Sequence, residues 1–467
     1  MSAWRWPHAP TLNVLRAAYA DGLSPAEMVD HLADRMEAGA APHAFIHAVE
    51  RGQLRAAAQA LGERPDGRPL WGIPFTVKDC NDVPGLPTTN ALPQMAYTPA
   101  STGRTIERIL DAGAICIGKT NMDQFGIGLV GMRSPYGAPS CVFSEEHISG
   151  GSSSGSGTAT ALGLGVFSIG NDAAGSGRVP AAFNNIVGLK PTPGLVSNTA
   201  VSGGGCVKTI ETMSVFALTV EDAMEITRLI AGYDPADLFS SPLADTADLE
   251  DGAPPSAFRF ATPAEKHLHF AGDADAARMF DAAVERLTAL GGVAVPVDFA
   301  PFHEAQAILY DGPWIAERAL SLDPVLAQHG EHIHPVTRQI LESAGSYSAT
   351  DTFRAIHRIA ELKRDTRWLW DDVDVLVVPT TPTIFTKAEI EEDPIGRNST
   401  LGIYTNFVNL MGLCGVAVPN GFRADGVPLG VTFLAPSFCE GRAARIAKAF
   451  HRHLGGRLGA SQSGVSA

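Results

Sequence analysis

The sequence predicts an α/β protein, because short apolar runs alternate with amphipathic helical stretches. Residues 72–79 (GIPFTVKD), 114–121 (AICIGKTN) and 165–172 (GVFSIGND) have the character of buried strands. Each run ends in polar or glycine-rich residues, and α/β proteins place their functional sites at such strand ends. With 467 residues, of which 45% are hydrophobic and 18% charged, the chain can bury a large core.

Helix signals lie between the expected strands. A helix is expected to follow Ser24 as N-cap, with Glu27 completing a capping box and Gly39 ending the helix. A second helix is expected over residues 273–290, and the run VAVPVDF at 293–299 follows it as a strand. This order of elements supports the α/β assignment.

One large domain is expected over residues 1–455, with a helical N-terminal part over 1–65. Residues 372–383 (DVDVLVVPTTPT) predict a further strand that enters a proline-rich loop. Residues 240–256 are polar, acidic and proline-containing, which favours a long surface connection over a domain boundary. A flexible C-terminal tail is expected over 456–467.

The charge balance and the cysteines narrow the possible partners and location. The chain has 35 basic and 50 acidic residues, a net charge of -15, which disfavours binding to nucleic acid or to anionic membranes. No run approaches the length of a membrane span and no signal peptide is recognisable, so we expect a cytoplasmic protein. The cysteines form no CxxC pair and are expected to be free thiols: Cys80, Cys116, Cys141, Cys206, Cys414 and Cys439.

A stretch of glycine and serine alone, SGGSSSGSG at residues 149–157, has the composition of a flexible linker. It is followed directly by TATALGLGVFSIG, a small-residue helix pattern that enters a buried strand. The stretch contains neither G-x-G-x-x-G nor G-x-x-x-x-G-K-[ST], so dinucleotide and phosphate loops are excluded by spacing. We therefore expect a tight loop that feeds a packed helix and offers hydroxyl and N–H groups to a ligand.

Three motifs in order resemble the amidase signature family: GIPFTVKD with Lys78, SGGSSSGSG with Ser152, and DAAGSGRVPA with Ser176. The resemblance extends from about residue 70 to about residue 440. It implies a large mixed twisted β-sheet covered by helices on both faces. It also implies a catalytic triad of Lys78, Ser152 and Ser176, with a cis peptide before Ser152, and hydrolysis of linear amides without metal or cofactor.

The resemblance gives each of these residues a chemical role. Ser176, between two glycines, is expected to be the nucleophile, and Ser152 is expected to relay its proton to Lys78. A lysine amine acts as a base only when uncharged, which burial favours. The backbone N–H groups of the segment Ala173, Ala174, Gly175 and Ser176 are expected to form the oxyanion hole.

Neighbouring charged residues are expected to support the fold. Asp172 and Arg178, on either side of the nucleophile loop, are expected to form a buried structural pair. Asp79 is expected to point away from Lys78, because successive residues of a strand face opposite sides. The histidine-rich stretch HGEHIHP at 329–335 matches no zinc spacing and is expected to be a solvated loop, so no metal site is expected.

Within the family, the stretch LYDGPWIAER at 309–318 most resembles allophanate hydrolases. That resemblance implies a small anionic amide substrate whose carboxylate is held by Tyr310 and Arg318, with Gly126 contributing backbone polar groups to the pocket. A guanidinium offers a carboxylate two parallel donors, and a phenol adds a third. Eight residues span about two helical turns, so Tyr310 and Arg318 can face one cleft if the segment is helical. On spacing alone, packing or capping of a helix is the favoured interpretation of the two residues, and the surrounding motif reverses that preference.

Some residues depart from the allophanate hydrolase pattern. Asn171 and Ala173 stand where threonine is usual, and residues 203–213 (GGGCVKTIETM) differ from the usual Cys-Arg-Ser-Leu-Asp pattern. Hydrolysis of another small ureide or amide therefore remains an alternative. The glutaminase subunit of a tRNA-dependent amidotransferase is a second alternative, and a catalytically inactive scaffold is a third.

Partners are the last expectation from the sequence. Many allophanate hydrolases carry a second, smaller domain that is implicated in decarboxylating the first product, N-carboxycarbamate. The residues after about 455 are too few to form it, so we expect either that this chain is a truncated amidase domain, or that the step is missing or belongs to a separate chain. We also expect a homodimer.

Overall fold

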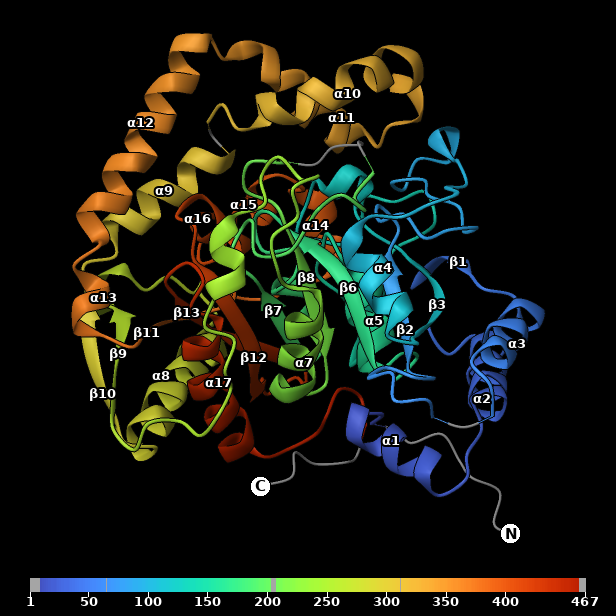
Figure 1. The fold of residues 1–467 in the computed structure, drawn as a ribbon. Helices are drawn as coiled ribbons and strands as arrows, with labels where there is room; N and C mark the ends of the chain where they lie inside the picture. The colour runs from blue at the N-terminus through green and yellow to red at the C-terminus, as the bar shows by residue number, and fades with distance from the viewer. Residues whose placement is uncertain (1–8, 64, 203–206, 311, 462–467) are drawn as a thin grey trace.

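The computed structural model describes residues 9–63, 65–202, 207–310 and 312–461. Most of its strands belong to one mixed sheet that runs through the centre of the molecule (Figure 1). The strands of this sheet are β1 (Phe45–Ala48), β2 (Pro74–Lys78), β3 (Ile115–Thr120), β6 (Phe167–Asp172), β7 (Val187–Lys190), β8 (Thr212–Ala217), β9 (Phe258–Pro263), β10 (Gly292–Val297), β11 (Val375–Pro379), β12 (Cys414–Phe422) and β13 (Pro428–Ala435). Their order across the sheet is β1-β3-β2-β6-β8-β7-β12-β13-β11-β9-β10. Two short strands, β4 (Ser140–Cys141) and β5 (Ser144–Ile148), form a separate pair.

The apolar runs predicted at 72–79, 114–121 and 165–172 form β2, β3 and β6, which are neighbours in the sheet. β2 lies between the other two and is parallel to both, whereas β6 is antiparallel to β8. Every residue of β2 and β6 is buried, the polar ones among them included, so both strands are covered on both faces. The predicted α/β class with a large mixed sheet is confirmed.

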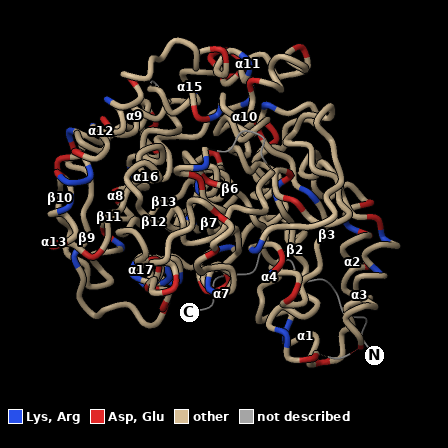
Figure 2. Tube along the Cα trace, turned by 45° about the horizontal axis from the view of Figure 1, so that its top comes forward, with Lys and Arg blue, Asp and Glu red and all other residues tan. Residues whose placement is uncertain are grey.

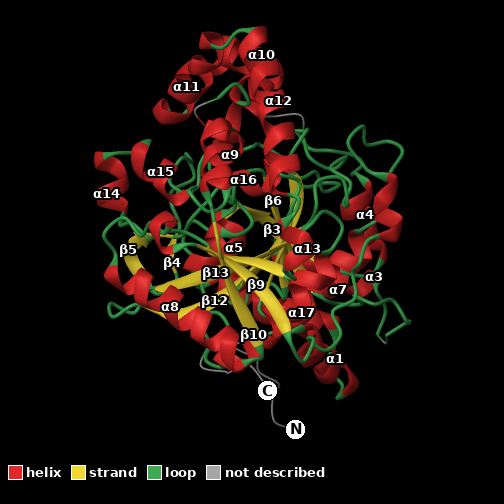
Figure 3. Ribbon diagram, turned by 90° about the vertical axis from the view of Figure 1, so that its left-hand side faces the viewer, coloured by secondary structure: helices red, strands yellow, loops and turns green. Residues whose placement is uncertain are grey.

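Helices occupy both sides of the sheet (Figure 3). The N-terminal helices are α1 (Leu12–Ala20), α2 (Pro25–Glu37), α3 (Arg51–Ala60) and α4 (Arg104–Asp111). The central ones are α5 (Ser154–Ala161), α6 (Val179–Phe183), α7 (Val220–Ile230), α8 (Ala274–Ala289), α9 (Ala300–Tyr310), α10 (Ile315–His329) and α11 (Pro335–Glu342). The C-terminal ones are α12 (Ala349–Thr366), α13 (Leu369–Asp372), α14 (Lys387–Glu392), α15 (Gly396–Leu401), α16 (Asn406–Leu410) and α17 (Glu440–Leu454).

The alternation of side chains along β13 shows how one strand serves two cores. Phe433 packs in the core that contains α17, and its ring lies 5.4 Å from that of Phe450, centroid to centroid. The next residue, Leu434, packs in a different core, with Phe407 of α16 and Leu309 of α9. Successive side chains of a strand point to opposite faces, so the two clusters lie on the two faces of the sheet.

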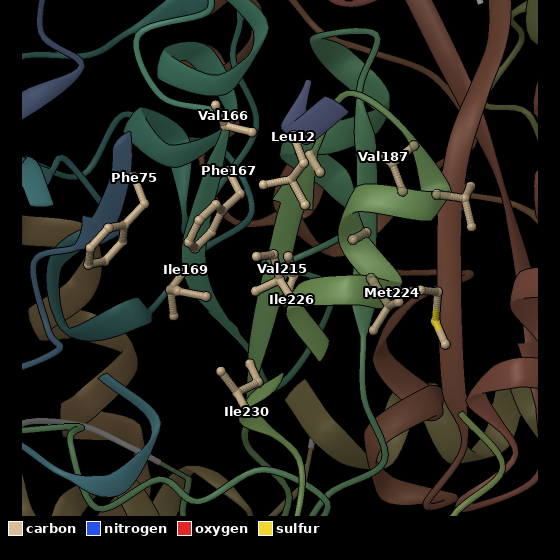
Figure 4. Packing of buried hydrophobic residues seen from close by; sticks show 14 of the residues in the cluster. Leu12, Phe75, Val166, Phe167, Ile169, Val187, Val215, Met224, Ile226 and Ile230 are labelled. Carbon is tan, nitrogen blue, oxygen red and sulfur yellow. The ribbon is translucent and has the colours of Figure 1, made fainter. Parts of the chain in front are cut away.

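The larger core lies between the sheet and α1 and α7, and Figure 4 shows part of it. Phe75 of β2 and Phe167 of β6 are paired across the strands, and their rings stack with centroids 5.3 Å apart. Leu12 of α1 and Ile226 of α7 belong to the same cluster and are fully buried. Burial of one such side chain contributes about 1.5–3 kcal/mol to stability. This core holds β2 and β6, the two strands that carry the site, in fixed register.

The N-terminal segment is helical as expected, and it also supplies a strand. The capping box of Ser24 and Glu27 forms at the start of α2. Between α2 and α3, β1 pairs antiparallel with β3 and forms one edge of the sheet. Further along the chain, α10, α11 and the adjoining part of α12 project beyond the sheet in two views (Figures 1 and 3).

Residues 456–461 differ from the flexible tail that we expected over 456–467. Leu458 is buried in a cluster with Ala161 and Phe216. The backbone N–H of Ala460 donates to Ala161, and the side-chain amide of Asn185 donates to the carbonyl of Gly459. One apolar side chain and these backbone hydrogen bonds are enough to hold the segment against α5. Residues 462–467 lie outside the described residues.

Charged residues of both signs lie along the outer helix α12 (Figure 2). On α12, Arg358 pairs with Glu304 of α9 and with Glu361 one turn further along. Among the helices that the structure describes, none is long and apolar enough to cross a membrane.

Candidate active site

Lys78, Ser152 and Ser176 form one continuous chain of hydrogen-bond contacts. Lys78 Nζ lies 2.8 Å from Ser152 Oγ, and Ser152 Oγ lies 2.8 Å from Ser176 Oγ. All three residues are buried, with exposed fractions of 1%, 1% and 4%. Lys78 is the last residue of β2, Ser152 precedes α5, and Ser176 follows β6. Because β2 and β6 are parallel neighbours, their carboxyl ends meet at one edge, where the loop before α5 also arrives.

Asp79 points away from this chain, as strand alternation predicts. Its carboxylate accepts hydrogen bonds from the backbone and hydroxyl of Thr89 and from the backbone of Ala91. It also lies 3.7 Å from the buried amine of Lys119. Burial lowers the pKa of Lys119, while the charge of Asp79 opposes that change.

The loop that carries Ser152 is too crowded for side chains larger than those of glycine and serine. The peptide bond between Gly151 and Ser152 is cis. A Cβ built on Gly151 would lie 2.1 Å from Asp123 Oδ2, and one on Gly150 would lie 3.1 Å from the backbone of Pro180. The Gly151 N–H donates to the carbonyl of Leu129. The composition of residues 149–157 therefore reflects close packing around Ser152, and not a linker.

The loop that carries Ser176 is fixed by the expected pair of Asp172 and Arg178. The carboxylate of Asp172 accepts from the Arg178 guanidinium at 2.9 and 3.0 Å, and both side chains are fully buried. The same carboxylate accepts from the N–H groups of Gly175 and Gly177, at 2.9 and 3.0 Å. Burial opposes ionisation of Asp172, but the Arg178 charge and these hydrogen bonds hold its pKa below the ordinary value. Ser176 is thus held from both sides.

The expected oxyanion donors are not equivalent. The Gly175 N–H already donates to Asp172. Within the described residues, the N–H groups of Ala173, Ala174 and Ser176 take part in no hydrogen bond. A Cβ on Gly175, whose φ is +129°, would lie 2.6 Å from Thr405 Oγ1, so only glycine fits at that turn. We therefore correct the expectation for Gly175, whose N–H is engaged with Asp172, and retain Ala173, Ala174 and Ser176 as candidate donors.

Lys78, Ser152 and Ser176 open onto a narrow cavity. Ala173, Gly126 and Arg318 line it together with the triad. A Cβ built on Gly126 would lie 3.7 Å from Ser152 Oγ and 3.9 Å from Arg318 Nη1, so a methyl group at this position would contact both groups. Arg318 Nη1 also donates to the carbonyl of Phe125 at 3.1 Å. The cavity therefore places a guanidinium near the serine pair, across a glycine.

Tyr310 and Arg318 lie on two helices and not on one. Tyr310 ends α9, Arg318 lies in the first turn of α10, and Gly312 and Pro313 fall between them. Proline fixes φ and lacks an N–H, so the helix does not continue through this segment. Tyr310 and Arg318 nevertheless line a common second cavity, which shares Ala173 and Arg318 with the first. The condition of one continuous helix is not met, but the two side chains do face one space.

Sequence reasoning missed other residues around the triad. Cys80, Met122 and Glu211 line the triad cavity, and so does Asn171, which we had singled out only as a departure from the family pattern. The position of Asn171 at the end of a buried strand, directly before Asp172, was the signal that could have found it. The carboxylate of Glu317 accepts from the backbone and hydroxyl of Thr209, and so ties α10 to the loop before β8.

The sequence analysis predicts no metal site. Among the described residues, no group of three or more His, Cys, Asp or Glu is placed to hold a metal ion. The five described cysteines are free thiols, and Cys206 lies outside the described residues.

The chain is similar to known proteins over most of its length. The family model described as Amidase matches residues 27–443. The urea amidolyase of Saccharomyces cerevisiae is 38% identical over 91% of this chain, and that of Lachancea kluyveri is 40% identical over 80%. These alignments span 23% and 20% of the two relatives, so the chain corresponds to about a fifth of their length.

Two further relatives bear on the activity. A solved structure of Kluyveromyces lactis allophanate hydrolase matches with a TM-score of 0.88 and 34% identity, covering 95% of this chain and 73% of that chain. A glutamyl-tRNA(Gln) amidotransferase subunit of Acidobacterium capsulatum is 32% identical over 82% of this chain and 85% of its own length.

Proposed function

The chain belongs to the amidase family, and from this membership and the geometry of the site we propose that it hydrolyses the terminal amide of allophanate and releases ammonia. The observation that carries the proposal is the contact from Lys78 Nζ through Ser152 Oγ to Ser176 Oγ, in a cavity that Arg318 also lines. The identity to allophanate hydrolase and to urea amidolyases supports the choice of substrate.

In the first half of the reaction, Ser176 Oγ attacks the carbon of the terminal amide. Its proton passes to Ser152, and the proton of Ser152 passes to the uncharged amine of Lys78. The oxyanion that forms is stabilised by the free backbone N–H groups of Ala173, Ala174 and Ser176. Return of the proton through Ser152 to the nitrogen breaks the carbon–nitrogen bond and releases ammonia. The product of this half-reaction is an acyl-enzyme on Ser176.

In the second half, water attacks the acyl carbon and gives its proton to the same relay. The ester bond to Ser176 breaks, the serine hydroxyl is restored, and N-carboxycarbamate leaves. All three members of the relay are buried, so the proton moves between partners 2.8 Å apart within the protein. No cofactor takes part in this scheme.

The anionic end of the substrate is bound by Arg318 and Tyr310. Both side chains face the second cavity, which continues from the triad cavity along Ala173. A carboxylate there accepts from a guanidinium and a phenol, while the amide at the other end reaches Ser176. Allophanate is planar and has only one nitrogen between its two carbonyl carbons, which suits a narrow cavity that Ser152, Gly126 and Arg318 line together.

The test is ammonia release from a panel of allophanate, biuret, malonamate, glutamine and simple aliphatic amides. We expect the highest kcat/KM with allophanate, and a loss of at least about 10⁴-fold in Ser176→Ala. Ser154→Ala is a matched control, because this buried hydroxyl of the same loop donates to the carbonyl of Asn121 and does not line the cavity. Equal turnover of allophanate and uncharged aliphatic amides would contradict the proposed substrate.

A glutaminase is the second candidate, favoured by the 32% identity to the amidotransferase subunit. In that case glutamine would be the best substrate of the panel, and its hydrolysis would rise when partner subunits of an amidotransferase are added. Allophanate turnover by the isolated chain, with no response to those partners, would exclude it.

The expected setting of the enzyme is part of the proposal. We propose a cytoplasmic homodimer without metal, whose first product is decarboxylated by a separate activity. The free thiols of the described cysteines are consistent with a reducing compartment. We expect sedimentation velocity to give a particle of twice the chain mass of 49.1 kDa. We also expect the activity to survive dialysis against EDTA.

A further inference from the structure

The side-chain amide of Asn171 is buried at the end of β6 and is only half satisfied. Asn171 lines the triad cavity with Lys78, Ser152 and Ser176, and its exposed fraction is 2%. Within the described residues, its Nδ2 has no hydrogen-bond partner. Buried polar groups in proteins are nearly always hydrogen-bonded, so an amide nitrogen left open beside a nucleophile requires an explanation.

The orientation of this amide is fixed by two donors on its other side. Asn171 Oδ1 accepts from Asn81 Nδ2 at 3.0 Å and from the Cys80 thiol at 3.2 Å. Asn81 Nδ2 also donates to the backbone carbonyl of Lys78 at 3.2 Å, which sets the orientation of Asn81. Burial raises the pKa of Cys80 to about 12, so its thiol keeps its proton and acts as the donor. A reversed Asn171 amide would place Nδ2 against both donors.

An amide held in this way has two N–H bonds and no protein acceptor within the described residues. The acceptor must then come from a water molecule in the cavity or from a ligand that displaces it. Carboxamides and ureides carry such acceptors in their carbonyl and carboxylate oxygens. Removal of one partner from a hydrogen bond inside a buried site costs more than its removal in water, so a donor placed here discriminates between ligands.

We propose that Asn171 Nδ2 donates a hydrogen bond to an oxygen of the bound substrate, and that Asn171 is a substrate-binding residue of this enzyme. The inference rests on the proposed function, because it takes a small carboxamide as the occupant of the cavity. It adds a side-chain donor to the backbone donors of Ala173, Ala174 and Ser176. It also gives a role to a position where this chain departs from the family pattern.

The test compares Asn171→Thr with Asn171→Val, two side chains of the same shape of which only threonine has a donor. Both are made in a Ser176→Ala background, and malonamate binding is measured by titration calorimetry, so that no turnover is needed. We expect Asn171→Val to raise the Kd about tenfold, and Asn171→Thr to stay within about threefold of the parent. Ser168→Ala is the matched control, because this buried hydroxyl of β6 donates to the carbonyl of Thr76 and does not line the cavity.

Equal Kd values for the threonine and valine variants would overturn the inference, and so would parent-like binding by Asn171→Val. A parent that does not bind malonamate would also overturn it. A merely structural role predicts a different result, in which the melting temperature of the ligand-free variants falls and the two Kd values remain equal. Failure of the proposed function is seen separately, as a native protein that binds malonamate through Asn171 but releases no ammonia from allophanate.

Discussion

Replacement of Asp172 by asparagine tests whether a buried ion pair holds the nucleophile. Asp172 makes four hydrogen bonds of 2.9 to 3.0 Å, two to Arg178 and one each to the N–H groups of Gly175 and Gly177. Both carboxylate oxygens accept from N–H groups, so the NH₂ group of asparagine would face N–H donors in place of one oxygen. The charge of Arg178 would then have no carboxylate partner in this pair. Removal of one partner from a buried pair costs about 3–5 kcal/mol, so we expect a loss of this size in the free energy of unfolding.

Urea denaturation followed by circular dichroism measures this loss, and the variant Arg178→Met completes a double-mutant cycle. The double variant Asp172→Asn/Arg178→Met leaves no unpaired charge, so we expect it to lose less stability than the sum of the two single variants. A loss below about 1 kcal/mol for Asp172→Asn, or strictly additive losses in the cycle, would refute the reasoning.

The same pair predicts how stability depends on pH. The pKa of Asp172 in the folded protein is held below its ordinary value, so the unfolded chain takes up the proton first as the pH falls. The contribution of Asp172 to the free energy of unfolding is therefore fully present above about pH 4 and is lost at more acidic pH, as its folded-state pKa is approached.

The variant Asp172→Asn also has an expected effect on activity. If the substitution displaces Ser176 by about 1 Å, we expect kcat to fall about 10²-fold.

Three further predictions concern the cavity. Lys78→Met is expected to lower kcat by about 10²- to 10⁴-fold, because Ser152 then has no proton acceptor, and stopped-flow or steady-state ammonia release measures it. Gly126→Ala is expected to raise the KM for allophanate, since its methyl would fill the space between Ser152 and Arg318 at a φ of +71°; an unchanged KM would show that the substrate does not use this space. Cys80 is expected to resist iodoacetamide at pH 8 in the folded protein, because its pKa is raised to about 12, and peptide mass spectrometry before and after denaturation checks this.

The sequence predicted the strands that carry the site, because those strands are buried on both faces. Each of the runs that became β2, β3 and β6 contains large apolar residues and ends in polar ones, a pattern that marks a buried strand. The edge strand β1 was missed, since its four residues are half exposed and no such run marks them. Its pairing with β3 depends on residues about 70 positions away, which no local pattern records.

The sequence predicted the residues of the triad better than it predicted the residues that line the rest of the cavity. The positions of Lys78, Ser152 and Ser176 follow from motifs, and all three are found in contact. The open amide of Asn171 could not be derived, because it depends on how Asn81 and Cys80 converge on one oxygen from another strand end. Spacing also misled, since eight residues between Tyr310 and Arg318 cover two helices joined by a turn.

The last two residues of β6 explain why one strand end serves both scaffold and chemistry. Asn171 and Asp172 are successive, so their side chains point to opposite faces. One side chain reaches the triad cavity and the other reaches Arg178, beneath the nucleophile loop. A change at Asn171 therefore acts on the ligand and a change at Asp172 acts on Ser176, although the two residues are adjacent. We therefore expect variants of Asn171 to change the Kd of the ligand, and variants of Asp172 to change kcat and the free energy of unfolding.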